Sequence, residues 1–141
     1  MKRGLWIILA AVLAAIDAHP VLHMSGVHVF AGTQILDAEV LLEQWSHSIS
    51  IASRVARQLA RPLETIDLGG GLGIPYYAGD KALNLDALAR GVPALRATMD
   101  ADPLLRGTRV ILEPGRFLTG SAGVYVMSVR AVKISRGTRF V

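Results

Sequence analysis

The chain has 141 residues, 52% of them hydrophobic, a formal net charge of +4 and no cysteine. This length and apolar content predict one modest domain with a buried core rather than a disordered chain. The absence of cysteine excludes a disulfide framework, a thiolate metal site and a cysteine nucleophile. Four basic residues near the end are interleaved with apolar ones, a pattern more typical of strands than of a basic arm that binds nucleic acid. We therefore expect no nucleic-acid partner. The four are Arg130, Lys133, Arg136 and Arg139.

The N-terminal segment, residues 1–20, has two interpretations. Lys2 and Arg3 precede an apolar run over 5–16, a pattern shared by signal peptides and buried helices. The run is too short to cross a bilayer comfortably, so we expect no membrane partner. We favour a helix over 9–18 that ends before Pro20, and a cytoplasmic protein. Secretion stays the alternative, and with it a small secreted or membrane-attached binding protein.

After Pro20, apolar runs alternate with helical patterns. The expected strands are 21–31, 64–68 and 109–112. The expected helices are 35–59 and 84–99, and Pro93 predicts that the second is split into two pieces. A turn is expected at 113–116, a β-rich stretch over 124–134 and a turn at 135–137. The alternation is typical of parallel α/β units, and the β-rich end indicates the start of another domain.

A glycine run, GGGLGIPY over 69–76, follows the second expected strand. Consecutive glycines let the backbone adopt positive φ and bring its N–H groups close to an anion. A dinucleotide fingerprint fails because Ile74 and Tyr76 stand where its last glycine belongs, and no phosphate-binding lysine motif follows. The run therefore indicates either a phosphate site or a glycine turn without a ligand.

A second motif, Glu113-Pro114-Gly115-Arg116, follows the third expected strand. It places a carboxylate and a guanidinium on one turn, which as a surface ion pair would contribute little. In a binding site, Arg116 is suited to hold a phosphate, and Glu113 to pair with a protonated ring nitrogen. Ligands of parallel α/β folds bind at the carboxyl ends of strands, where both motifs lie.

A third motif, GVHVFAGTQ over 26–34, lies at the end of the first expected strand. Strand alternation points His28 and Phe30 to the same side, as core residues or as site residues. Thr33 lies beyond the strand, where its hydroxyl could cap the next helix or contact a phosphate. The four histidines lack the spacing of a helical zinc site, except a pair that straddles Pro20, so we expect no metal.

Together the three motifs resemble those of the pyridoxal-phosphate (PLP) dependent decarboxylases of fold type III. This group includes ornithine, diaminopimelate and arginine decarboxylases. The motif GVHVFAGTQ is most similar to the diaminopimelate decarboxylase branch. The resemblance covers the chain from about residue 21 to its end. It implies the C-terminal part of an alanine-racemase-like (β/α)8 barrel over 21–123, with the start of a β-domain over 124–141. Alanine racemase itself fits less well, because racemases of this fold have an arginine where Glu113 stands.

The resemblance also implies residue roles. Gly69, Gly70 and Gly71 would bind the PLP phosphate through backbone N–H groups, and Arg116 would join them. Glu113 would face the pyridine nitrogen. Thr33 stands where the family has a phosphate-contacting serine, and His28 matches a family histidine. Phe30 stands where many members stack a histidine on the cofactor ring; it can stack, but it cannot hydrogen-bond or carry charge.

The resemblance implies further parts that this sequence lacks. The family forms a Schiff base with a lysine in a context that Lys2, Lys81 and Lys133 do not share, and a Cys-Asp pair is absent. A (β/α)8 barrel needs about 250 residues. We therefore expect a fragment of an amino-acid decarboxylase that is inactive alone and forms a homodimer when complete. The alternative is a noncatalytic PLP- or phosphate-binding protein of the same barrel fold.

Overall fold

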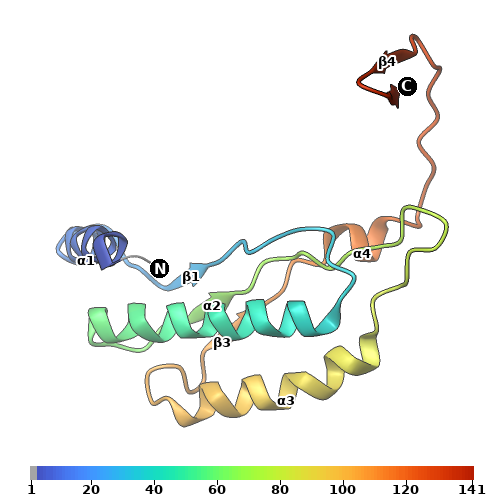
Figure 1. The fold of residues 1–141 in the computed structure, drawn as a ribbon. Helices are drawn as coiled ribbons and strands as arrows, with labels where there is room; N and C mark the ends of the chain where they lie inside the picture. The colour runs from blue at the N-terminus through green and yellow to red at the C-terminus, as the bar shows by residue number, and fades with distance from the viewer. Residues whose placement is uncertain (1–2) are drawn as a thin grey trace.

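A three-stranded parallel sheet forms the centre of the fold in the computed structural model, which describes residues 3–141 (Figure 1). The strands, in spatial order, are β1 (Gly26–His28), β2 (Thr65–Asp67) and β3 (Arg109–Ile111). Parallel neighbours need a crossover connection, and the two crossovers contain α2 (Ala38–Leu59) and α3 (Leu85–Ala101). The α/β alternation that the sequence predicts is confirmed.

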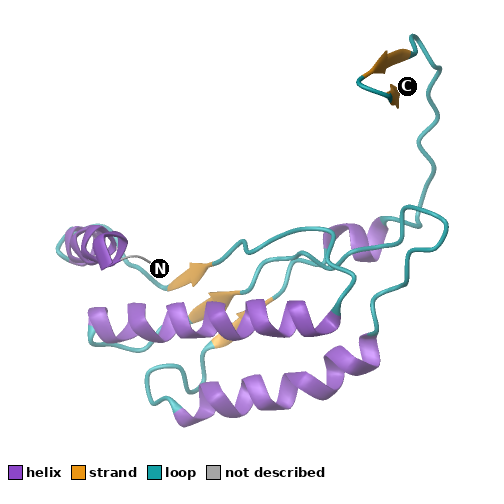
Figure 2. Ribbon diagram, in the orientation of Figure 1, coloured by secondary structure: helices purple, strands orange, loops and turns teal. Residues whose placement is uncertain are grey.

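The two crossover helices lie on the same side of the sheet (Figure 2). Val27, Ile66 and Val110 are paired across the three strands, and Ile66 is fully buried in the core formed with α2. Because successive side chains of a strand point to opposite faces, the next paired row faces away from the helices. That row holds His28 and Asp67 at the carboxyl ends of β1 and β2.

The ends of α2 are defined by local hydrogen bonds. The Asp37 carboxylate accepts from the Glu39 amide at 2.8 Å, which caps the first turn, so the helix begins later than the expected residue 35. Ile35 instead pairs with Leu72 in an isolated parallel bridge. Ala60 adopts a left-handed conformation with φ of 52°, and its amide bonds back to the last turn. The bridge brings the start of α2 next to the glycine run.

The expectation that Pro93 splits the second helix is wrong, because α3 continues through it. A proline inside a helix removes one backbone hydrogen bond. The buried side chains Leu88 and Met99 flank Pro93 and belong to the same hydrophobic core. Packing on both sides of the proline therefore outweighs the lost hydrogen bond.

The N-terminal helix and the first strand differ in length from the expectations. Helix α1 (Arg3–Asp17) begins well before residue 9, while Lys2 lies outside the described residues. Helix α1 contacts α2, where the Arg54 guanidinium lies 3.4 Å from the centre of the Trp6 ring. No helix among residues 3–141 is long and apolar enough to cross a membrane. The first strand covers three residues instead of 21–31, because only Gly26–His28 pair with β2.

The C-terminal segment contains a hairpin that lies apart from the sheet (Figure 1). It consists of β4 (Lys133–Ser135) and β5 (Thr138–Phe140), joined by Arg136 and Gly137 at φ of 50° and 79°. Two left-handed residues match the tight turns that join antiparallel strands, so the expected turn is confirmed. The expected β structure over 124–132 is not observed, because no strand among the described residues pairs with this stretch.

A cluster of polar side chains joins α2 to the end of α3. The Asp102 carboxylate accepts from the Ser53 hydroxyl at 2.6 Å and from Arg57 at 3.0 Å. The amide of Leu104 donates to its other oxygen at 3.1 Å. The Ser53 hydrogen bond, aided by the Leu104 amide and the charge of Arg57, lowers the pKa of Asp102 below its ordinary value of 3.8, although burial opposes it.

This lowered pKa predicts a pH-dependent contribution to stability. An aspartate whose pKa is lower in the folded state stabilises that state above its unfolded pKa, and the contribution is lost as pH falls through the folded pKa. We expect the free energy of unfolding of the wild type to exceed that of Asp102→Asn at neutral pH, and the difference to shrink below about pH 4. Urea titrations of both proteins at several pH values measure it. A difference that stays constant down to pH values near 2 would contradict the prediction.

Candidate functional site

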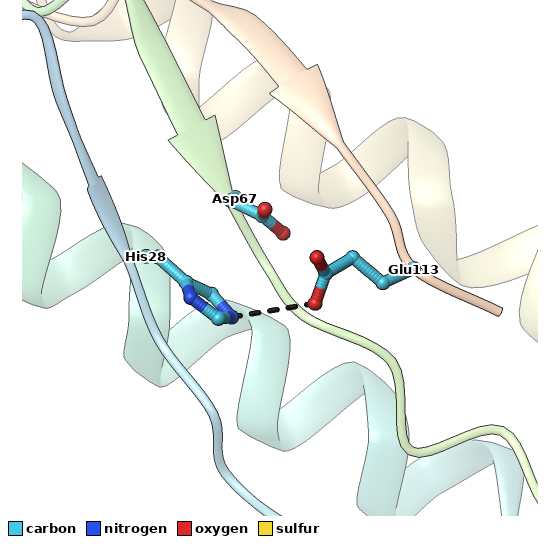
Figure 3. Close-up of side chains that lie close together, drawn as sticks. All are labelled: His28, Asp67 and Glu113. Carbon is cyan, nitrogen blue, oxygen red and sulfur yellow. Dashed lines mark ion pairs between the residues drawn. The ribbon is translucent and has the colours of Figure 1, made fainter. Parts of the chain in front are cut away.

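Three side chains meet at the carboxyl ends of the three parallel strands (Figure 3). His28 ends β1, Asp67 ends β2, and Glu113 follows β3 on the same face as Ile111, two residues earlier. The His28 Nε2 and a Glu113 carboxylate oxygen lie 3.5 Å apart, and one ligand atom of each of the three residues lies within 4.8 Å of the others. The histidine and Glu113 side chains are about half exposed, so His28 is not a core residue.

The glycine run crosses closely over the strand ends. Gly69 and Gly71 have φ of 70° and 91°, which side chains rarely tolerate. A Cβ on Gly70 would overlap the backbone oxygen of Glu113, and a Cβ on Gly71 would lie 3.0 Å from the Gly32 oxygen. The Glu113 amide donates to the Gly69 oxygen at 2.9 Å. The two sequence motifs are thus in direct backbone contact, as the strand-end argument predicts.

The amides of the glycine run are not equally free. The Gly69 amide donates to the Asp67 carboxylate at 2.8 Å. Within residues 3–141, the amides of Gly70 and Gly71 donate to no protein acceptor. The predicted phosphate contact of Gly69 would therefore require its bond to Asp67 to break, whereas the other two amides are ready to donate.

Arg116 lies in the first turn of the short helix α4 (Gly115–Thr119), which begins inside the expected turn at 113–116. One Nη of Arg116 donates to the Tyr76 hydroxyl at 2.5 Å, and the other donates to the Thr33 hydroxyl. Three loops that follow three different strands are joined through this guanidinium. Thr33 therefore contacts Arg116, and it does not cap α2, where Asp37 is the cap.

A cavity of about 200 Å³ lies between these loops. Its lining residues are Phe30, Thr33, Gly70, Gly71, Leu72, Glu113, Gly115 and Arg116. Six of the eight residues named from the sequence line it, while His28 and Gly69 lie beside it. Phe30 is 70% exposed, so it is a surface residue of the cavity and not part of the core. A larger cavity of about 430 Å³ between α2 and α3 contains none of these motifs.

Sequence reasoning missed three residues at or near the cavity: Asp67, Leu72 and Tyr76. Asp67 was detectable as an aspartate two residues before a glycine, a spacing that favours a side-chain bond to the backbone. Tyr76 closes the glycine motif, but its contact with Arg116 spans 40 residues and depends on the path of the loop. The absence of a metal stays a prediction, since His28, Asp67 and Glu113 have the approximate spacing of a ligand set.

The two lysines in the described part of the chain lie away from the cavity. Lys81 lines a different hollow beside the start of α2, and Lys133 begins the hairpin strand β4. Neither lines the cavity, and Lys2 lies outside the described residues. The described residues therefore place no amine at the site.

Comparisons with known proteins agree with this architecture. Residues 1–120 match the family model described as pyridoxal-dependent decarboxylase, pyridoxal binding domain. The chain is 32% identical over 133 residues to the L-glutamyl-BtrI acyl-carrier protein decarboxylase of Niallia circulans, covering 94% of this chain and 31% of that protein. It is 30% identical over 144 residues to the diaminopimelate decarboxylase of Escherichia coli K12, covering 99% of this chain and 32% of that enzyme.

A solved structure shows the same fold. The diaminopimelate decarboxylase of M. jannaschii matches with a TM-score of 0.71 and 25% identity, over 99% of this chain and 31% of that one. A second structure of the same enzyme, in complex with L-lysine, matches with a TM-score of 0.70. The chain spans about a third of the length of these relatives.

The parallel strands and their crossover helices define part of a (β/α)8 barrel, with a cavity at the strand ends. The chain belongs to the family of pyridoxal-dependent decarboxylases, and it matches their pyridoxal-binding domain. The resemblance of the three sequence motifs to this family is therefore confirmed, as is PLP as the cofactor of the family.

Proposed function

We propose that this chain supplies the cofactor phosphate and ring-nitrogen site of a PLP-dependent amino-acid decarboxylase. The observation that carries the proposal is one cavity lined by Gly70, Gly71, Arg116 and Glu113, in which the two glycine amides have no acceptor among the described residues. A side chain at Gly70 would collide with the backbone, so the glycine keeps the two loops in contact. The donors and the carboxylate in this cavity fit a phosphorylated, protonated pyridine ring.

Each residue has a separate task in this proposal. Backbone amides and the Arg116 guanidinium bind the phosphate, to which charge-assisted hydrogen bonds are strong. Thr33 adds a hydroxyl, and Phe30 offers a flat apolar face to the ring. The Glu113 carboxylate holds a proton on the ring nitrogen, and His28 orients that carboxylate from 3.5 Å. PLP, when bound, supplies the electron sink that amino-acid decarboxylation requires.

The whole enzyme extends this proposal beyond the described residues. We infer an amino acid or an amino acid linked to a carrier as substrate, because relatives include diaminopimelate decarboxylases and a decarboxylase of a glutamyl carrier protein. Two solved relatives carry L-lysine. We further propose a homodimer, residues 21–123 as barrel, residues 124–141 as the start of a β-domain, and a location in the cytoplasm. The amine that bonds to the cofactor would come from outside the described residues.

Binding of pyridoxine 5′-phosphate, which lacks the reactive aldehyde, tests the proposed site without any Schiff base. We expect the chain to bind this ligand in a calorimetric titration, and Arg116→Ala to weaken binding by about tenfold or more, because hydrogen bonds to charged groups contribute about 1.5–3 kcal/mol. Arg130→Ala is the matched control, since Arg130 is an exposed arginine that does not line the cavity. Absence of binding by the wild type, or equal binding by Arg116→Ala, would contradict the proposal.

A further inference from the structure

Tyr76 forms a hydrogen bond with the Arg116 guanidinium but has no role in the proposed site. Its hydroxyl accepts from Arg116 Nη1 at 2.5 Å, while the Thr33 hydroxyl accepts from the other Nη. Tyr76 does not line the cavity, whereas Thr33 and Arg116 do. The tyrosine therefore acts on any bound ligand only through the arginine.

The charge of Arg116 is not neutralised by a neighbouring carboxylate. Among residues 3–141, Arg116 forms no ion pair, and the nearby Glu113 carboxylate pairs with His28 instead. Two neutral hydroxyls hold the guanidinium, so its full positive charge stays available to an anion. A hydroxyl that accepts from a guanidinium turns its own hydrogen away from it, so the Thr33 hydroxyl keeps a hydrogen that it can donate to another group.

The backbone of Tyr76 is itself held in place. The Asp80 carboxylate accepts from the amides of Tyr76 and Tyr77 at 2.9 and 3.0 Å, and Pro75 restricts the preceding backbone. The ring of Tyr76 has only two side-chain torsions, so it presents its hydroxyl at low cost in conformational freedom. The neighbouring Tyr77 is 77% exposed, and its hydroxyl has no hydrogen-bond partner in the described part of the chain.

We propose that Tyr76 is a positioning residue for phosphate recognition, which holds Arg116 toward the glycine cavity before the ligand arrives. This inference rests on the proposed function, because it assumes that the cavity takes the phosphate of a pyridoxal-type ligand. An arginine that is already oriented loses less conformational entropy when the anion binds, so its hydrogen bond to the anion contributes more to the affinity. The Tyr76 hydroxyl thus contributes to the affinity for a phosphate ester and not to the affinity for the ring.

Tyr76→Phe removes the hydroxyl alone, and two ligands separate its effect from a general loss of structure. We expect the affinity for pyridoxine 5′-phosphate, measured by calorimetry on the full chain, to fall about threefold to tenfold, which corresponds to one hydrogen bond. The affinity for pyridoxine, which lacks the phosphate, should not change. The matched control Tyr77→Phe should bind both ligands as the wild type does. In an Arg116→Ala background, Tyr76→Phe should cause no further loss, because the residue it positions is gone.

The outcomes distinguish this inference from the proposed function. A wild-type chain that binds no pyridoxine 5′-phosphate overturns the proposed function, and the role of Tyr76 with it. A wild-type chain that binds, together with a Tyr76→Phe variant that binds as tightly, overturns the role of Tyr76 alone. An equal loss for both ligands also overturns it, since that result indicates a structural role.

Discussion

Gly70→Ala is expected to abolish binding of pyridoxine 5′-phosphate and to destabilise the fold. The added Cβ overlaps the backbone oxygen of Glu113, and a backbone atom cannot move aside as a flexible side chain can. The Glu113 amide bonds to the Gly69 oxygen at 2.9 Å, so the two loops cannot separate without losing that bond. We expect a loss of about 1–3 kcal/mol in the free energy of unfolding, as for overpacked sites. Separation of the loops also moves the glycine amides away from Arg116.

Gly123→Ala is the matched control for this variant. A Cβ at Gly123 meets no atom within 4 Å, its φ is not in the left-handed region, and it does not line the cavity. Calorimetric titration with pyridoxine 5′-phosphate and urea unfolding of both variants measure the two effects. If Gly70→Ala binds as tightly as Gly123→Ala, then the close crossing of the loops does not shape the site.

The sequence predicts that these motifs lie together, because strand-end geometry determines most of their arrangement. The glycine run and Glu113 each follow a parallel strand, and parallel strands place their carboxyl ends at one edge. Contacts such as that of Arg116 with Tyr76 depend on how two loops travel beyond the sheet, which no local pattern encodes. The bond from the Gly69 amide to Asp67 changes which amides are free, and only this contact has a local sequence signal, the spacing of two residues.

Element types follow from the sequence more readily than element lengths. The expected strand 21–31 is largely apolar, yet β1 (Gly26–His28) is short because a strand needs a partner and only these three residues pair with β2. The largely apolar stretch over 124–132 likewise forms no strand, because no strand among the described residues pairs with it. For Pro93, local propensity predicts a break in the helix, but the tertiary contacts of Leu88 and Met99 keep α3 continuous. In each case packing or pairing outweighs the local signal.

Ile66→Ala is expected to give the largest loss of stability among single truncations in the sheet. Ile66 is fully buried at the middle of the central strand, where it pairs with Val27 on one side and Val110 on the other. Truncation of a buried isoleucine to alanine typically costs about 2–5 kcal/mol, because transfer energy is lost and a cavity remains. The next residue is Asp67, so the same strand positions the site. We expect the midpoint of urea unfolding to fall accordingly.

Ile134→Ala provides a control with the same chemistry in a different environment. Ile134 also lies in a strand, β4, but it is 75% exposed, and surface substitutions usually change stability by no more than about 0.5 kcal/mol. The fluorescence of Trp45, which is buried in the same core as Ile66, reports unfolding of both variants. Equal midpoints for the two variants would mean that the three-stranded sheet is not the stable centre of the fold. A large difference between the two midpoints would instead show that the strands carrying the site belong to a core that this chain forms by itself.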